Sequence, residues 1–334
     1  MPAQKDEDEE CEKERASGVL LYLEDRYEIN NNKIKGLDNF PEEICSVLSK
    51  YKDVFDTSTK KTMSVPDAQL NLKDGYRPTR CYTCRFTPFH YMETTDKLIA
   101  DLIAQGVLEE SRDTRTEWCS PGHFVQKPSR VPMALRLVVD FTGLNSYLIR
   151  DQAATFPTGD DIRKQLGPDC KVWMCMDALS TYYQVKIRPS DVHKTTFIVN
   201  NKRYQFLSTV MGNKLSSDTW LRASDEVTNG LPGVFKLVDN LLIGGRDYAE
   251  LAARVDALLA RCQAVNMTLS SNKIQVGPRV TFAGYVVERT TVYADPAKVE
   301  AITWFPEPTK LKELRGWFGL TNQLLNYVPG LAGK

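Results

Sequence analysis

The sequence predicts a mixed protein of helices and strands, with a core large enough for two or three subdomains. Its 334 residues and its hydrophobic content of 42% leave ample room for such a core. Segments with the apolar spacing of helices are interspersed with short apolar runs typical of strands. Two of these runs lead directly into a carboxylate, at Asp177 and at Asp239. We therefore expect a folded protein in which acidic groups lie at the rim of a sheet.

Charge is balanced over the whole chain but not along it. The 43 Lys and Arg residues equal the 43 Asp and Glu residues, which argues against a strongly basic coat for nucleic acid. A local basic channel stays open as an alternative. Residues 1–15 contain seven acidic and three basic residues. Because such a charge run is most often solvated, residues 1–40 are predicted to be an acidic, disordered N-terminal segment.

The eight cysteines and the absence of a signal-peptide pattern predict a reduced, intracellular protein that is not secreted. No window reaches the roughly 18 apolar residues of a membrane span, so no membrane partner is expected. Cys81 and Cys84 form a lone CxxC pair, and Cys119 and His123 could complete a zinc set. We expect no zinc site there, because Cys119 lies in a turn-like segment and His123 can simply alternate along a strand.

Five segments show the apolar spacing of helices. They are residues 41–55, 92–108, 216–228 and 247–265, and a last part that opens at Asp295-Pro296. In the second, Leu98, Leu102 and Ile103 are predicted to line one face and Gly106 to end the helix.

The third and fourth helices have predicted start signals. Either Ser216 or Ser217 is expected to cap the third. The fourth is the clearest helix of the chain, with Asp247 near its start and an apolar stripe from Leu251 to Cys262.

Alternating or continuous apolar runs predict the strands. Residues 118–145 indicate two strands around a loop, and residues 195–199 and 203–207 indicate a hairpin that turns at Asn200-Asn201. The segments 273–277 and 280–288 are expected to form a further hairpin with each other. Residues 56–90 are weakly periodic and are predicted to be an extended lead-in.

The two carboxylates that follow apolar runs are the candidate chemical centre. Asp177 could merely cap the next turn, and Asp239-Asn240 could be an ordinary tight hairpin turn, since Asx pairs favour such turns. A hairpin there would also hold Asp239 at a sheet edge, where it could share divalent metal with Asp177. That arrangement suits two-metal phosphoryl transfer, and Mg²⁺ prefers such hard oxygen ligands.

An ordered set of motifs resembles the reverse transcriptase of gypsy-type LTR retrotransposons over roughly residues 42–330. The matching stretches are WCSPGHFVQK, LRLVVDFTGLN, MDALSTYYQVKI, HKTTF, YQFLSTVMGNKLSSDTW, LVDNLL, LSSNK, VTFAGYVV and DPAKVEAITWFPEPTKLKELRGWFGLTN. LVDNLL stands where the family has YxDDIL, and the last stretch is very similar to the family's DPxKVxAIxxWPxP…LRSFLGLxN. One motif alone is weak, but the order of the whole set is specific.

The resemblance implies an α+β fold of the right-hand polymerase type, with fingers, a ferredoxin-like palm and part of a thumb. On this basis residues 41–90 are a lead-in helix and extended segment, residues 91–290 are fingers and palm, and residues 291–334 begin the thumb. The implied partners are an RNA or DNA template-primer and deoxynucleoside triphosphates. Two Mg²⁺ ions are the implied cofactors, with Mn²⁺ as an alternative. An oligomer is not excluded.

The resemblance also assigns roles residue by residue. Asp177 and Asp239 would bind metal, Asn240 stands at the second YxDD aspartate, and Lys273 at a lysine that protonates the leaving pyrophosphate. The implied nucleotide-binding residues are Arg136 and Lys127 for the triphosphate, Tyr182 under the sugar, and Gly212 beside the template–nucleotide pair. Phe282, Gly284 and Tyr285 would belong to the primer grip.

The departures from the family pattern fall at positions of chemistry or substrate binding. Leu237 replaces the YxDD tyrosine, Asn240 its second aspartate, and Thr142 an arginine that follows Asp140-Phe141. Residues 215–221 stand where the family has NAPATFQ. A working polymerase with impaired chemistry is therefore the first interpretation, and an inactive retroelement relic that binds nucleic acid or a partner chain is the second. A nucleotide cyclase would share only the core and lack the thumb-like end.

Overall fold

The structure is a computed structural model and describes residues 34, 37–58, 61–83, 85, 87–111, 116–126, 135–150 and 169–322. The predicted acidic segment 1–40 lies almost wholly outside these residues, as do Lys127 and Cys84. The expectation that no zinc binds at the cysteines therefore stays a prediction. None of the helices in the described part of the chain is long and apolar enough to cross a membrane.

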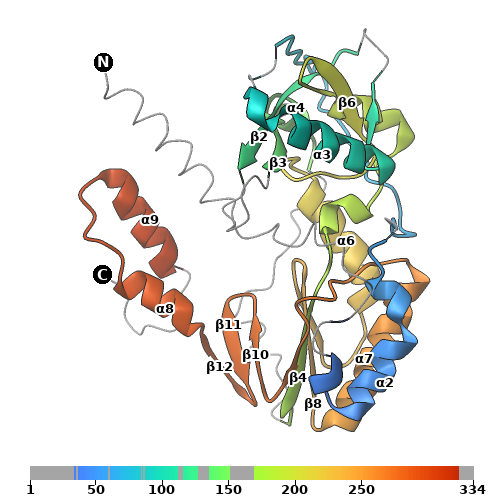
Figure 1. The fold of residues 1–334 in the computed structure, drawn as a ribbon, viewed down its shortest axis with the longest axis vertical. Helices are drawn as coiled ribbons and strands as arrows, with labels where there is room; N and C mark the ends of the chain where they lie inside the picture. Colours follow the sequence, from blue (N-terminus) through green and yellow to red (C-terminus); the bar gives the residue numbers. More distant parts are fainter. Residues whose placement is uncertain are drawn as a thin grey trace.

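A four-stranded antiparallel sheet with the order β7-β8-β4-β9 forms the lower half of the molecule in Figure 1. Its strands are β4 (Val172–Asp177), β7 (Val234–Leu237), β8 (Asn240–Gly245) and β9 (Gln275–Gly277). Helix α6 (Ser216–Thr228) lies between β4 and β7 in the chain, and α7 (Tyr248–Ala264) lies between β8 and β9. The order β4-α6-β7-β8-α7-β9 is the βαββαβ pattern of a ferredoxin-like core.

Helices cover one face of this sheet. Residues two apart on a strand point to the same face, and on this face they are apolar. Met174 and Met176 of β4 and Leu241 and Ile243 of β8 pack on α6, α7 and α2 (Glu42–Lys50). The predicted stripe of α7 is confirmed, since its five apolar residues are fully buried. Asp247, which the sequence placed near the start of this helix, is its cap, and its side chain accepts the amide proton of Glu250 at 2.8 Å.

A five-stranded sheet with the order β1-β6-β5-β2-β3 forms the upper half in Figure 1. Its strands are β1 (Leu108–Glu110), β2 (Ser120–Gln126), β3 (Leu135–Val139), β5 (Phe197–Val199) and β6 (Lys202–Phe206). Helices α3 (Met92–Ala104) and α4 (Thr142–Tyr147) pack with it. The predicted hairpin at Asn200-Asn201 is confirmed, because both residues have the positive φ of a tight primed turn.

Two details of the predicted helices are wrong. Ile103 does not line the buried face of α3, since it is 39% exposed and Ile99 is buried instead. Ser216 is the first residue of α6 rather than its cap, and its hydroxyl donates to the carbonyl of Val210 at 2.7 Å. That contact ties α6 to the preceding loop, so a tertiary bond replaces the local cap that the sequence suggested.

A three-stranded sheet covers part of the other face of the lower sheet. It consists of β10 (Arg279–Phe282), β11 (Tyr285–Glu288) and β12 (Thr291–Ala294), and it packs Val280, Phe282 and Val287 against Trp173 and Cys175. The predicted hairpin between residues 273–277 and 280–288 is therefore wrong. Residues 275–277 pair with β4, and the hairpin lies within 279–288, where Ala283 and Gly284 have positive φ.

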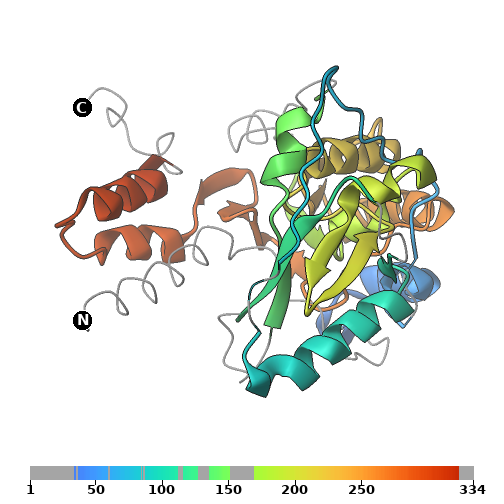
Figure 2. The same ribbon diagram turned by 90° about the horizontal axis from the view of Figure 1, so that it is seen from above.

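The last two helices extend away from the rest of the described chain, as Figures 1 and 2 both show. They are α8 (Pro296–Thr303), capped by Asp295 as the sequence suggested, and α9 (Leu311–Asn322).

A buried ion cluster fastens the lead-in segment to the upper half. The Asp191 side chain is 2% exposed and accepts from Lys194 Nζ at 2.6 Å, from the Leu70 amide at 2.9 Å and from Arg188 Nε at 3.0 Å. Burial alone would raise the pKa of this carboxyl, but the Lys194 and Leu70 hydrogen bonds and the two positive charges outweigh it, so the pKa is lowered.

Replacing Asp191 by asparagine is expected to lower the free energy of unfolding by about 3–5 kcal/mol at neutral pH, because it leaves a buried lysine without its counter-charge. Since folding lowers the pKa, the stabilisation is present above the unfolded value of about 3.9 and is lost as the pH falls through the folded value. Urea unfolding at several pH values measures both effects. Asp256→Asn in the exposed Lys50–Asp256 pair is the matched control and should change stability little.

Candidate active site

The β7–β8 hairpin presents Asp239 beside the end of β4. Leu237 pairs with Asn240, so the two turn residues are Val238 and Asp239. The sequence placed the turn one residue later, at Asp239-Asn240, and this is corrected by the strand register. Asn240 is drawn into β8 because it pairs with Asp177 across the sheet. The Ala178 amide donates to the Asp239 carbonyl at 2.7 Å and docks the turn against the end of β4.

The two aspartates influence each other electrostatically. Burial raises the pKa of Asp239 to about 6, and the nearby charge of Asp177 adds to this rise. The Asn240 amide, which donates to Asp239 Oδ1 at 3.0 Å, and the charge of Lys273 oppose it. Lys273 Nζ lies 3.5 Å from Asp177 Oδ2. The structure thus brings together the four residues that the sequence singled out for the chemistry.

These polar groups lie on the sheet face away from α7. Asp177 shares its face of β4 with Cys175 and Trp173 by the two-residue period, while Met174 and Met176 face the helices. Burial raises the pKa of the Cys175 thiol, and the charges of the two nearby aspartates add to this rise. Cys175 is thereby an inert, protonated neighbour of the site.

Tyr182 follows β4 in the chain and contacts α6 through Ser217. It belongs to the 3₁₀ turn Thr181–Gln184, and its hydroxyl lies 3.1 Å from Ser217 Oγ. The Thr209 hydroxyl donates to the Tyr182 carbonyl. The first contact holds the end of the ring, and the second holds the backbone of the same residue.

Arg136 lies in the upper sheet, on β3 opposite Val125. Its Nε is buried and has no hydrogen-bond partner among the described residues. Burial lowers the pKa of the guanidinium. A buried, unpaired Nε fits a group that awaits an anionic ligand, whereas the suggested helper, Lys127, lies outside the described residues.

Gly212 occupies an exposed turn that leads into α6. Its φ of +89° is in the region that favours glycine, and a Cβ there would lie 3.5 Å from the Val139 carbonyl oxygen. The Asn145 side chain secures this turn, donating to the Gly212 carbonyl at 2.7 Å and accepting from the Lys214 amide at 2.9 Å. Sequence reasoning gave Asn145 no role, although it closes the LRLVVDFTGLN motif.

Of the three suggested primer-grip residues, one is buried and the other two lie at a turn. Phe282 is 1% exposed and anchors β10 in the core. Gly284 and Tyr285 are half-buried at the β10–β11 turn, where Lys298 Nζ lies 5.6 Å from the centroid of the Tyr285 ring. A Cβ on Gly284 would collide with the Lys298 ammonium group, so the turn and α8 are closely packed.

Comparison of the chain with known proteins shows which family it resembles. Residues 125–287 match the model of the family described as Reverse transcriptase (RNA-dependent DNA polymerase), and this match includes both aspartates, Asn240 and Lys273. The Pol polyprotein of the transposon opus from Drosophila melanogaster is 26% identical over 330 residues, which cover 94% of this chain. The chain therefore contains a reverse transcriptase domain, and it is similar to the Pol polyproteins of LTR retrotransposons.

Further relatives agree with this reverse transcriptase assignment. The Pol polyprotein of the Drosophila melanogaster transposon gypsy is 28% identical over 70% of this chain. The chain spans about a third of the opus polyprotein (32%) and 23% of the gypsy polyprotein.

Solved structures show the same fold. A foamy viral protease-reverse transcriptase in complex with double-stranded DNA superimposes with a TM-score of 0.78 at 20% identity, covering 94% of this chain and 55% of that one. The same viral enzyme in complex with an RNA/DNA hybrid gives a TM-score of 0.76 at 19% identity, covering 100% of this chain and 42% of that one. The predicted right-hand polymerase fold is therefore confirmed.

Reverse transcriptases use divalent metal ions, and the side chains at this site fit that use in part. Asp177, at the end of β4, and Asp239, in the adjacent turn, are hard oxygen donors. A cation there would offset the burial and the repulsion that raise the pKa of Asp239. Within the described residues, no three Asp, Glu, His or Cys side chains gather as a metal-binding cluster. Asn240 supplies an amide where the family motif has a third carboxylate.

Proposed function

We propose that this reverse transcriptase chain is an RNA-directed DNA polymerase that adds deoxynucleotides to a primer 3′-hydroxyl, at a rate limited by Asn240. The observation that carries the proposal is the placement of Asp177 and Asp239 at one rim of the β7-β8-β4-β9 sheet, with Lys273 beside Asp177. Residues 91–290 would be fingers and palm, and residues 291–334, which include α8 and α9, would begin the thumb.

In this proposal Asp177 and Asp239 hold two Mg²⁺ ions, which Mn²⁺ could replace. Bound metal supplies activation of the attacking oxygen and stabilisation of the leaving one. Lys273 contributes a proton for the leaving pyrophosphate, and its contact with Asp177 keeps its ammonium group at the site. Asn240 steadies Asp239 by its amide hydrogen bond but adds no negative charge.

The remaining predicted residues would bind substrate. The half-buried Arg136, whose Nε has no partner among the described residues, is suited to a triphosphate oxygen, with Lys127 as its helper. Tyr182, fixed by Ser217, would lie under the incoming sugar, and the exposed turn at Gly212 would let the backbone approach the template–nucleotide pair. Gly284 and Tyr285, with Phe282 as their buried anchor, would grip the primer.

The partners in this proposal are an RNA or DNA template-primer and deoxynucleoside triphosphates, in an intracellular setting and either as a monomer or as an oligomer. The structural relatives were solved with double-stranded DNA or an RNA/DNA hybrid, which supports this class of partner.

A second candidate is a catalytically silent retroelement relic that binds nucleic acid or a partner chain. It is favoured by one set of observations, the substitutions at Leu237, Asn240 and Thr142, which affect positions of chemistry while the buried residues around them stay apolar.

Primer extension by the purified chain decides between these candidates. We expect slow, metal-dependent extension that Asp177→Ala abolishes and that Asp256→Asn, in the exposed pair with Lys50, leaves unchanged. Extension that persists in the Asp177→Ala variant would point to a contaminating polymerase. Absence of extension in every variant, combined with retained template-primer binding, would favour the relic.

Replacing Thr142 by arginine is expected to lower the KM for deoxynucleotide several-fold while changing kcat little. Thr142 is exposed at the first residue of α4, where its amide bonds Asp140 Oδ1 at 2.9 Å, so a longer side chain can extend into solvent without disturbing the core. An arginine there adds a fork of donors for phosphate. Steady-state kinetics measures KM and kcat separately, and Thr142→Gln is the uncharged control.

A further inference from the structure

The turn that carries Asp239 has a backbone conformation that it would not adopt unaided. Val238 has a φ of +57°. This left-handed region is strongly disfavoured for a β-branched residue, so surrounding contacts must hold it. Any such contact also sets the position of the next residue, Asp239.

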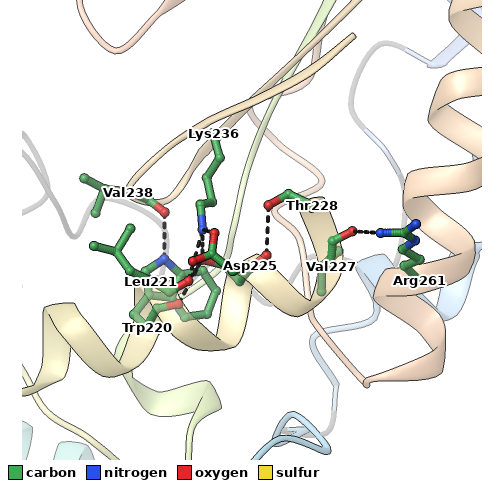
Figure 3. Close-up of polar contacts among 9 residues, drawn as sticks. Trp220, Leu221, Asp225, Val227, Thr228, Lys236, Val238 and Arg261 are labelled. Carbon is green, nitrogen blue, oxygen red and sulfur yellow. Dashed lines mark hydrogen bonds and ion pairs between the residues drawn. The ribbon is translucent and has the colours of Figure 1, made fainter. Parts of the chain in front are cut away.

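One side chain of α6 makes that contact. The indole Nε1 of Trp220 donates to the Val238 carbonyl at 2.7 Å, and Trp220 is fully buried in the core between the β7-β8-β4-β9 sheet and its covering helices. Figure 3 shows the indole below the hairpin with its N–H directed at the Val238 carbonyl. A buried indole that lost this acceptor would leave its donor unsatisfied, so both groups favour the contact.

A second set of contacts between the hairpin and α6 comes from Lys236, two residues before Val238 on β7. Lys236 Nζ donates to Asp225 Oδ1 at 2.6 Å and to the Leu221 carbonyl at 3.1 Å, both on α6 (Figure 3). It also donates to Ser224 Oγ of the same helix at 2.7 Å. Lys236 fixes the strand, whereas Trp220 acts at the turn itself. The position of the hairpin relative to α6 is thus fixed by contacts at two residues, Lys236 and Val238.

We propose that Trp220 is a positioning residue for Asp239, whose indole hydrogen bond to the Val238 carbonyl holds the hairpin turn in the conformation that brings the two aspartates together. The family motif has phenylalanine at this position, which fills the same space but has no donor. The catalytic consequence rests on the proposed polymerase function, but the conformational claim does not.

The test compares Trp220→Phe with Trp173→Phe. Trp173 is equally buried, and its indole donates at 2.7 Å to the carbonyl of Arg289, which also has positive φ, in the turn between β11 and β12. Both variants therefore lose one indole donor at a strained turn, but only one of these turns carries Asp239.

The primary readout is the exchange rate of the Ala178 amide, whose bond to the Asp239 carbonyl reports on docking of the turn. We expect Trp220→Phe to speed its exchange about two- to tenfold relative to Trp173→Phe, as the loss of one hydrogen bond predicts. Adding Val238→Gly should slow exchange again, because glycine accepts positive φ without strain. Equal exchange of Ala178 in the two single variants overturns the proposal.

Two further measurements distinguish the positioning role of Trp220 from a folding defect and from the proposed polymerase function. If Trp220→Phe fails to fold, benzothienylalanine at position 220 keeps the bicyclic shape while sulfur replaces the N–H, and the same exchange difference is expected. In primer extension, Trp220→Phe should lower kcat about ten- to a hundredfold without changing template-primer affinity. A chain without extension that still shows the exchange difference would refute the polymerase function but not the positioning role.

Discussion

Primer extension is expected to rise by about two orders of magnitude when Asn240 is replaced by aspartate, the size of effect found when a single charge-stabilising group is removed from an active site. Asn240 lies opposite Asp177 in the register of β4 and β8, and its amide bonds Asp239 Oδ1 at 3.0 Å. A carboxylate at this point would face the same rim of the sheet. It would supply the negative charge that a metal pair needs beside a triphosphate.

The same substitution should make the metal-free protein less stable. Burial and Asp177 already raise the pKa of Asp239, and a third carboxylate would replace a helpful hydrogen bond by repulsion. We therefore expect Asn240→Asp to lower the Tm without Mg²⁺ and to recover it as Mg²⁺ is added, since a ligand that binds only the folded state stabilises it.

Asn240→Ala is the matched control for this result, because it removes the amide without adding charge. It should not raise extension. If Asn240→Asp also leaves extension undetectable while template-primer affinity is kept, missing charge is not the main defect. The fault would then lie in the substituted segment from Val210 to Trp220, where the template strand is expected to pass.

Local patterns predicted the elements whose stability is local. Helix α7 combines a capping Asp247 with a stripe of apolar residues, and both signals act within a few turns, so the structure follows them. The Asn200-Asn201 turn succeeded for the same reason, since asparagine tolerates positive φ at little cost.

The predictions failed where a contact distant in sequence outweighs a local preference. The Asx rule placed the hairpin turn at Asp239-Asn240, but pairing of Asn240 with Asp177 moves it to Val238, a residue that disfavours such a turn. The Trp220 bond that compensates comes from a different helix. No spacing within the hairpin could have revealed it.

The candidate site was likewise predicted in its residue types but not in its supports. Two carboxylates after apolar runs suggested a metal site, and the ordered motifs gave each residue its expected role. The contacts that hold the site, such as Asn145 across the Gly212 turn and Ser217 on Tyr182, join segments far apart in the chain. Such contacts depend on tertiary packing and become visible only in the structure.

Binding of template-primer is expected to survive substitutions that abolish catalysis. Asp177→Ala should leave the affinity for a primer-template nearly unchanged, because in the proposed function binding would draw on many backbone contacts spread over fingers, primer grip and thumb. Catalysis instead depends on one constellation around Asp177 and Asp239, which already has an amide at Asn240 in place of a carboxylate.

The salt dependence of this binding provides the quantitative test. The chain as a whole is neutral, so affinity must come from a local group of cations against phosphates. If 6–10 phosphates are contacted, affinity should fall by roughly a thousandfold to a hundred-thousandfold between about 50 and 200 mM salt. Fluorescence anisotropy with a labelled primer-template measures both quantities. A shallow salt slope, or an affinity that collapses in Asp177→Ala, would show that binding and catalysis share one small site and would contradict this prediction.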